Sequence, residues 1–386
     1  MGFLLKDIKK HLLTIDWVLV MTVFLSMVYG FMLIISASNV LGVKAQSRIL
    51  LVQVVAVIIG AIAMFIISKS DYDHVIKYWK TLYAFGVIIL ILTLILGSGD
   101  EVGSRSWIRV HIGSTTVGIQ PSEIVKITFI MTFARHLDRV KDDINSPKNI
   151  GLLILHFIVI FGLVLLQNDL GTGLVFIVIF LAMCFAAGVS LWYFLGGAFV
   201  LVASSPLIWN LMGEYQRQRI LVGFNPQLDP LYVGFQPLVS QRAIGSGGLF
   251  GAGWGHGYYT QRDTIPEQWT DFIYSAAGEE FGFIGAILVL ILLTIIIARI
   301  FVISRKARNT VGSLICVGVM AIFIAQTVEN IGMCLGLLPV VGIPLPFFSY
   351  GGSSILGSLL GIGVVLSVNC RKNIYYFTRD ENLDKF

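Results

Sequence analysis

Carboxylates that stand beside cationic residues in strongly apolar surroundings are the part of this sequence that predicts chemistry. The most specific pattern comes directly before a long apolar run and reads Ile265-Pro266-Glu267-Gln268-Trp269-Thr270-Asp271-Phe272. At such a boundary a carboxyl group is partly desolvated, which raises its pKa, whereas a nearby helix start lowers it. The sequence leaves the balance of these two effects open, so Asp271 is a candidate general base, with Asp169 and Glu267 as the alternative acids.

A second candidate lies on a short apolar segment, where Glu123 and Lys126 follow Gln120-Pro121-Ser122. Their three-residue spacing puts both side chains on one face of a helix. Charged groups at membrane depth are costly and by default indicate function, so the two residues form either a structural ion pair or part of a substrate site. Asp169 precedes Leu170-Gly171-Thr172 and is either a helix N-cap or a contact to a ligand cation.

Arginines that flank an aromatic ring form the third candidate. In residues 103–109, Arg105 and Arg109 stand on either side of Trp107. Two guanidinium groups can hold a diphosphate by bidentate hydrogen bonds while the indole stacks on a sugar face. The alternative is a tryptophan that anchors the loop at the membrane interface, with solvated arginines around it. Arg217 and Arg219 form a second cationic pair.

The elements that must position these residues are membrane helices. Of the 386 residues, 56% are apolar and 13% are charged, and the mean hydropathy is +0.85. Soluble domains are roughly 45–50% apolar and about 25% charged, so the composition excludes a water-soluble enzyme, a disordered regulator and a disulfide scaffold. A membrane span needs about 20 apolar residues. Ten segments are candidates, of which 122–136 is the weakest because it is short and charged: 15–37, 46–67, 79–97, 122–136, 150–167, 170–188, 191–210, 272–300, 311–335 and 350–370.

The distribution of basic residues predicts how these spans cross the membrane. If the loops alternate between the two sides, 18 of the 27 Lys and Arg residues lie on the side of the N-terminus and eight on the other side. Because basic residues accumulate in cytoplasmic loops, we expect an all-α polytopic membrane protein with ten transmembrane helices and both termini in the cytoplasm. Residues 211–271 then form a large extracytoplasmic loop between the seventh and eighth helices, rich enough in aromatic residues to fold onto the bundle.

The sequence contains no motif for a metal site, a nucleotide-binding loop or a nucleic-acid interface. The six histidines show no metal-ligand spacing, and the four cysteines lie within or at the ends of apolar segments, which is typical of core residues. The glycines between residues 245 and 257 fit neither of the nucleotide-binding fingerprints. The net charge of +5 is explained by cytoplasmic loops rather than by nucleic acid. We therefore expect no metal site built by the protein and no nucleic-acid partner.

Taken together, the motifs resemble those of the SEDS family (shape, elongation, division and sporulation), whose members include RodA, FtsW and SpoVE. The resemblance covers nearly the whole chain, as a single transmembrane domain over residues 1–386. The form Gly342-Ile343-Pro344-Leu345-Pro346-Phe347 is more similar to RodA than to FtsW, while Asn168 departs from the proline that the family usually has. The matching motifs are residues 103–109, 120–126, 169–172, 243–251, 266–273 and 336–354.

The resemblance implies a peptidoglycan glycosyltransferase of the bacterial cytoplasmic membrane. Such an enzyme polymerises lipid II, an undecaprenyl-diphosphate-linked disaccharide pentapeptide, during cell elongation or division. It implies a class B penicillin-binding protein as the transpeptidase partner, together with the elongation or division machinery and membrane lipid. Two other functions remain open: a flippase for lipid-linked precursors, with Glu123, Lys126, Asp169 and Glu329 along its path, or a non-catalytic scaffold.

A single base is enough for this reaction. Glycosidases need a second carboxyl group to protonate an alcohol leaving group, whereas a diphosphate leaves without a proton when cations neutralise it. Asp271 would take the proton of the acceptor hydroxyl. No cofactor with a dedicated site is expected, although Mg²⁺ or Mn²⁺ can accompany the diphosphate. The predicted substrate-binding residues are Arg105, Trp107, Arg109, Glu123, Lys126, Asp169, Arg217, Arg219 and Glu267.

Overall fold

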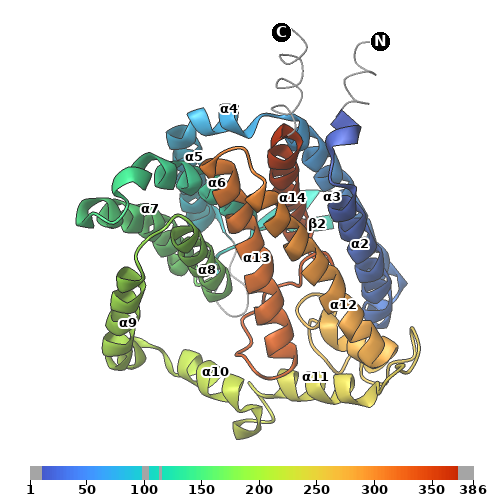
Figure 1. Cartoon of the computed structure of the whole chain (residues 1–386). Coiled ribbons are helices and arrows are strands. Elements are labelled where there is room, and N and C mark those ends of the chain that lie inside the picture. The colour runs from blue at the N-terminus through green and yellow to red at the C-terminus, as the bar shows by residue number, and fades with distance from the viewer. Residues whose placement is uncertain (1–10, 98–103, 113–114, 373–386) are drawn as a thin grey trace.

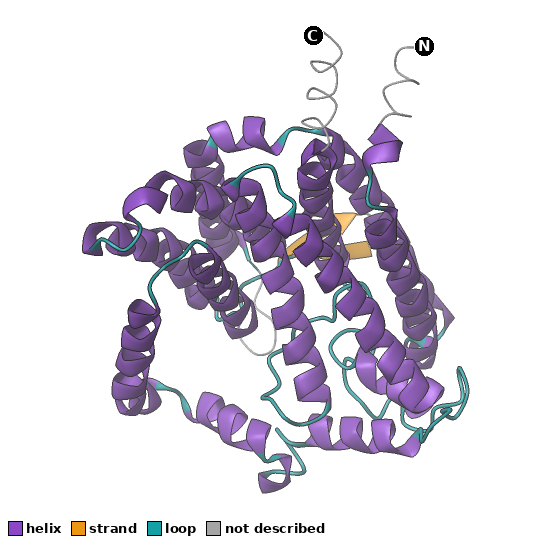
Figure 2. Cartoon of the chain, in the orientation of Figure 1, coloured by secondary structure: helices purple, strands orange, loops and turns teal. Residues whose placement is uncertain are grey.

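The chain folds into a bundle that is mostly helical, as a computed structural model shows (Figures 1 and 2). The structure describes residues 11–97, 104–112 and 115–372. The helices are α2 (Trp17–Ala37), α3 (Val43–Lys69), α4 (Tyr72–Lys77), α5 (Trp79–Leu96), α6 (Ser122–Val140), α7 (Pro147–Leu166), α8 (Leu170–Ala186), α9 (Leu191–Leu211), α10 (Glu214–Phe224), α11 (Phe235–Ser246), α12 (Ile273–Arg305), α13 (Thr310–Cys334) and α14 (Gly352–Lys372).

Each of the ten predicted segments coincides with a long helix, because an uninterrupted apolar run must satisfy its backbone polar groups internally. Among the described residues, seven of these helices are long and apolar enough to cross a membrane. Of the other three, α8 and α9 have shorter apolar stretches and α6 carries several charges. The structure is therefore that of a multi-pass membrane protein. Both chain ends, for which a cytoplasmic location is expected, lie outside the described residues.

One segment does not follow the all-α expectation. Between α5 and α6, strands β1 (Ile108–Ile112) and β2 (Thr115–Ile119) pair antiparallel, with Arg109 opposite Gly118. The β-branched side chains of both strands favour this extended conformation. The segment is too short and too polar to form an apolar run, so hydropathy does not predict these strands.

Helix α13 lies at the centre of the bundle and contacts α6, α8, α12 and α14 (Figure 1). Helix α14 packs along α3, and α2 packs along α12. On the side of the bundle opposite α4, α11 packs against α12 and α13. The segment 211–271 therefore contains helices and contacts the bundle through α11.

Helix α12 contains a break that the sequence did not predict. Gly282 has φ 65° and ψ −160°, a conformation open essentially only to glycine. The turn before this break carries two buried glutamates. Glu279 accepts hydrogen bonds from the backbone N–H groups of Tyr259 and Thr260 at 2.7 and 2.9 Å, while Glu280 accepts from Ser36. These bonds hold the loop before Asp271 against the first turns of α12.

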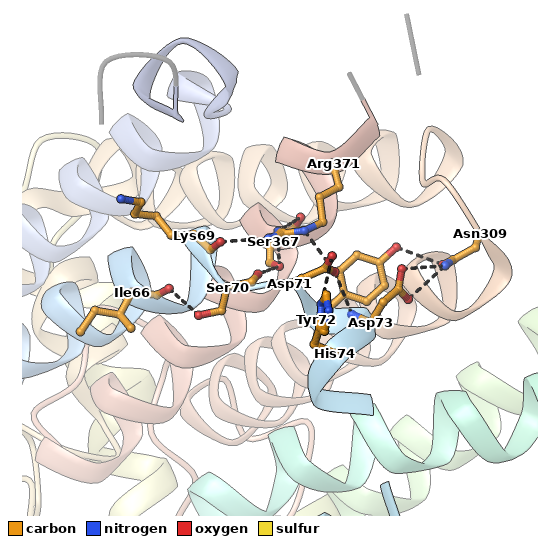
Figure 3. Close-up of polar contacts among 10 residues, drawn as sticks. All are labelled: Ile66, Lys69, Ser70, Asp71, Tyr72, Asp73, His74, Asn309, Ser367 and Arg371. Carbon is orange, nitrogen blue, oxygen red and sulfur yellow. Dashed lines mark hydrogen bonds and ion pairs between the residues drawn. The ribbon is translucent and has the colours of Figure 1, made fainter. Parts of the chain in front are cut away.

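A polar network fastens the opposite end of the bundle (Figure 3). Arg371, near the end of α14, forms an ion pair with Asp71 at 3.1 Å and donates to the carbonyl of Lys69 at 2.9 Å. Asn309 caps α13, accepts a hydrogen bond from Tyr72 at 3.0 Å and donates to the carboxylate of Asp73. The network thereby joins the end of α3 and α4 to α13 and α14.

Candidate functional site

The predicted base Asp271 lies in the turn that leads into α12. Its backbone N–H donates to the carbonyl of Glu267 at 3.0 Å, and Glu267 itself adopts a left-handed φ of 54°. The backbone carbonyl of Asp271 accepts a hydrogen bond from the side-chain amide of Asn330 on α13 at 2.7 Å. The carboxylate faces Gly342, where an added Cβ would lie 3.3 Å from Oδ2. Asp271 is therefore fixed at its backbone while its side chain stays partly accessible.

The surroundings of Asp271 give its carboxyl group an unusual pKa. Its pKa is raised from the ordinary value to about 7: burial makes the largest contribution, the charge of Glu267 adds to it, and the charge of Arg219 acts against both. A carboxyl group with a pKa near the working pH is suited to general-base catalysis, because a useful fraction is ionised and its proton affinity is high. Glu267 is exposed and accepts a hydrogen bond from Thr270 at 3.0 Å.

Glu123 and Lys126 form the ion pair that their spacing predicts. The Lys126 Nζ lies 2.8 Å from the Glu123 Oε1, and the two residues are 2% and 4% exposed. They border a cavity of about 10 Å³ between α6, α13 and α14, which has room for about one water molecule. Lys126 also acts electrostatically on Glu329 of α13, whose Oε2 is buried without a hydrogen-bond partner. Lys126 therefore forms a direct ion pair with Glu123 and acts on Glu329 through its charge alone.

Asp169 is the N-cap of α8, as one of its two interpretations predicts. Its Oδ1 accepts from the backbone N–H of Thr172 at 3.0 Å. Its Oδ2 accepts from the side-chain amide of Gln120 at 2.8 Å, which brings the segment before α6 against the start of α8. Asn168 has φ 58°, a left-handed conformation that asparagine tolerates and proline cannot adopt. The departure from the family motif thus changes the local turn and leaves the acid in place.

The predicted arginines occupy different surroundings. The backbone N–H of Arg105 donates to the carbonyl of Gln167 at 2.9 Å, so the backbone of Arg105 lies beside the turn that contains Asp169, and its side chain is exposed. Arg109 is exposed on β1. Arg217 donates to the carbonyls of Trp209 and Asn210 at 2.8 and 3.0 Å, so its guanidinium group is engaged within its own segment.

Two groupings result from these positions. The first contains Asp271, Glu267 and Arg219, and the second contains Glu123, Lys126 and Glu329. Helix α13 links the two groupings, because its Glu329 belongs to the second and the adjacent Asn330 binds Asp271 of the first. Trp107 packs on Gly118 in the hairpin, where an added Cβ would lie 3.1 Å from its ring.

Sequence reasoning missed several residues that build this site. Asn330 was not selected, because a lone polar residue in an apolar run carries no motif signal. The family motif includes Gly342, but no local pattern shows that it approaches Asp271. Within the described parts of the chain, no group of three or more His, Cys, Asp or Glu residues could hold a metal ion.

Comparison with known proteins adds independent evidence. A family model described as cell cycle protein, for FtsW, RodA and SpoVE, matches residues 16–374. A protein named peptidoglycan glycosyltransferase MrdB from Escherichia coli strain K12 is 37% identical over 325 residues, which covers 82% of this chain and 85% of that protein. Stage V sporulation protein E of Bacillus subtilis strain 168 is 38% identical over 328 residues, which covers 81% and 84%.

Solved structures share the fold. A crystal structure of the rod shape determining protein RodA from Thermus thermophilus aligns with a TM-score of 0.68 at 27% identity, covering 92% of this chain and 96% of that one. A chain of a peptidoglycan synthase complex that coordinates polymerization and crosslinking aligns with a TM-score of 0.78 at 29% identity, covering 93% and 98%.

Fold and site together define a polytopic membrane protein with an acid at one end of a helical bundle. The chain belongs to the FtsW/RodA/SpoVE family, also called SEDS.

Proposed function

We propose that this chain is a peptidoglycan glycosyltransferase that polymerises lipid II into glycan strands at the outer face of the bacterial cytoplasmic membrane. The observation that carries the proposal is Asp271, a carboxylate in the turn before α12 whose pKa is raised to about 7. Family membership and the names of the relatives, peptidoglycan glycosyltransferase among them, support the same activity. Because the sequence resembles RodA, we place this activity in cell elongation and shape maintenance.

The proposal includes a topology. The whole chain is one transmembrane domain with ten spans and cytoplasmic termini, and residues 211–271 lie outside the cell membrane. The excess of basic residues on one side of the predicted spans supports this orientation. A cysteine placed at Gln241, on a background without the four native cysteines, should react with a membrane-impermeant reagent in intact cells. Labelling by permeant reagents alone would contradict the topology.

The proposed reaction needs one base and several cations. Asp271 accepts the proton of the acceptor sugar hydroxyl, and that oxygen forms a bond to the anomeric carbon of the donor. The bond between this carbon and the diphosphate oxygen breaks, and the undecaprenyl diphosphate leaves with its electron pair. Arg219 acts on Asp271 through its charge, and the exposed Arg105 and Arg109 are further candidates to neutralise the diphosphate. Arg217 and Lys126, the other two predicted cations, would first have to leave the carbonyls of α9 and the carboxylate of Glu123.

Other contacts follow from the same reaction. Trp107 would stack on a sugar, and Asp169, Glu123 and Glu267 would orient the substrate or the cations around it. Mg²⁺ or Mn²⁺ can accompany the diphosphate without a dedicated protein site. A class B penicillin-binding protein within the elongation or division machinery is the proposed partner, supported by the fold match to a complex that coordinates polymerization and crosslinking.

The test uses purified protein and fluorescent lipid II in detergent, where no bilayer exists to flip a lipid across. Asp271→Asn keeps the size of the side chain and removes the base, so we expect turnover to fall by about 10²–10⁴. Asp263→Asn is the matched control, because Asp263 is an exposed acid in the same loop. If wild-type protein makes no polymer even with its partner, the flippase or scaffold function is favoured. Near-normal synthesis by folded Asp271→Asn would refute the role of Asp271.

A further inference from the structure

Asn330 holds together the two loops that border Asp271. Its side chain is fully buried on α13, and its single amide nitrogen donates twice, to the carbonyl of Asp271 at 2.7 Å and to the carbonyl of Ile343 at 2.8 Å. An asparagine amide has two N–H groups, and both are used here. One residue on the central helix therefore sets the distance between two loops that come from different parts of the sequence.

The same two loops meet at two further points. The backbone N–H of Tyr350 donates to the carbonyl of Trp269 at 2.9 Å, and Gly342 lies directly against the carboxylate of Asp271. Gly342 has φ 72°, so its backbone approaches without a side chain. The position of the carboxylate thus depends on how closely the Gly342 loop is held. Asn330 holds this loop because it binds the carbonyl of Ile343, the residue after Gly342.

We propose that Asn330 is a positioning residue, which fixes the Asp271 carboxylate against the Gly342 loop for proton abstraction. This inference rests on the proposed function, in which Asp271 is the base. Asn330 is fully buried and its amide binds the backbone carbonyls of Asp271 and Ile343, so in this proposal it acts through those two residues and not on the reacting atoms. Displacement of a catalytic group by about 1 Å can reduce turnover by about 10²-fold.

The surroundings of Asp271 provide a readout that a purely structural role would not change. The groups that face its carboxyl group are Glu267 in the same loop, Arg219 on α10 and Cys334 on α13. Burial makes the largest contribution to its raised pKa. If Asn330 is removed, the loops separate and water reaches the carboxylate, so the pKa falls toward its ordinary value. The rising limb of the pH–rate profile then moves to lower pH.

The experiment measures kcat, KM and the pH–rate profile of lipid II polymerisation by the full chain with its partner. For Asn330→Ala we expect kcat to fall by about 10²-fold, with KM little changed and the acidic midpoint displaced to lower pH. Asn330→Asp keeps the shape of the side chain but can donate at most one hydrogen bond. Its kcat and its acidic midpoint should therefore change in the same direction as those of Asn330→Ala. If Asn330→Ala does not fold, Asn330→Asp alone tests the proposal.

Gln268→Ala is the matched control. The Gln268 side chain is equally buried, and its amide also donates to two carbonyls, those of Ala37 and Thr260, at 2.7 and 2.9 Å. Its loss should reduce stability without moving the acidic midpoint. The positioning role would be overturned if the acidic midpoint stayed unchanged in both Asn330 variants, or if it moved equally in Gln268→Ala. Polymerisation by the wild type would uphold the proposed function in either case. Absence of polymerisation by the wild type would refute the function itself.

Discussion

Removal of Lys126 from the buried pair of Glu123 and Lys126 should destabilise the bundle more than removal of Glu123. At 2.8 Å two unit charges attract by about 6 kcal/mol at an effective dielectric constant of 20, and the cost of burying them offsets much of this. The free-energy cost of removing one charge is the cost of leaving its partner buried and unpaired. This cost is about 3–5 kcal/mol for a buried charge.

The structure predicts which deletion is worse. Lys126→Met leaves the buried carboxylate of Glu123 without its ion-pair partner and removes the positive charge that acts on Glu329, so the full cost of about 3–5 kcal/mol is expected. Glu123→Gln leaves Lys126 with Glu329, so the cost should be nearer to about 1–3 kcal/mol. The double variant replaces the pair by neutral groups and should be more stable than Lys126→Met alone.

Unfolding in detergent micelles by titration with sodium dodecyl sulfate measures these free energies. The control is Arg135→Gln on the same helix. Arg135 pairs with Asp138 at 2.9 Å with the same spacing but is 38% exposed, so less than about 1 kcal/mol is expected. Equal free-energy costs for Lys126→Met and Glu123→Gln, or a cost for the double variant that equals the sum of the two single costs, would refute the reasoning that Lys126 acts on both carboxyl groups.

Three further predictions concern other parts of the molecule. Polymerisation should rise with pH through about 7, because Asp271 is protonated and inactive as a base below its raised pKa; a pH–rate profile that is flat between pH 6 and 8 would contradict this. Gly342→Ala introduces a side chain at φ 72° beside the Asp271 carboxylate, so the strain of about 1–3 kcal/mol should reduce both stability and kcat; unchanged kinetics would exclude contact at this point. Arg371→Gln removes the ion pair with Asp71 and should cost about 1.5–3 kcal/mol in the same unfolding assay, whereas Lys141→Gln, from an exposed pair, should have almost no effect.

Local patterns in the sequence predicted most of the helices and two of the contacts in the site. Apolar runs located all ten long helices, because an uninterrupted apolar run satisfies its backbone polar groups within a helix. The ion pair of Glu123 and Lys126 and the N-cap at Asp169 were predictable, since both are interactions between residues three apart.

The remaining contacts connect residues that are distant in sequence. Asn330 binds Asp271 across 59 positions, and Gly342 meets the Asp271 carboxylate only because two loops fold together. Arg217 and Arg219 are indistinguishable by spacing, yet Arg217 binds carbonyls of its own segment while Arg219 acts on Asp271. Periodicity contains no information about such tertiary neighbours, so only the folded chain separates them.

The packing of α14 along α3 has a consequence for biogenesis. Roughly 280 residues separate the end of α3 from the start of α14, and ribosomes add about 5–20 residues per second. The face of α3 that α14 covers must therefore wait about 15–60 s in the membrane for its partner. During that interval Gln53 lacks the backbone of Ser349 and Gly351 with which it bonds in the finished bundle. A nascent chain of this protein thus exposes an unfinished surface to insertion factors and membrane proteases until its last helix is made.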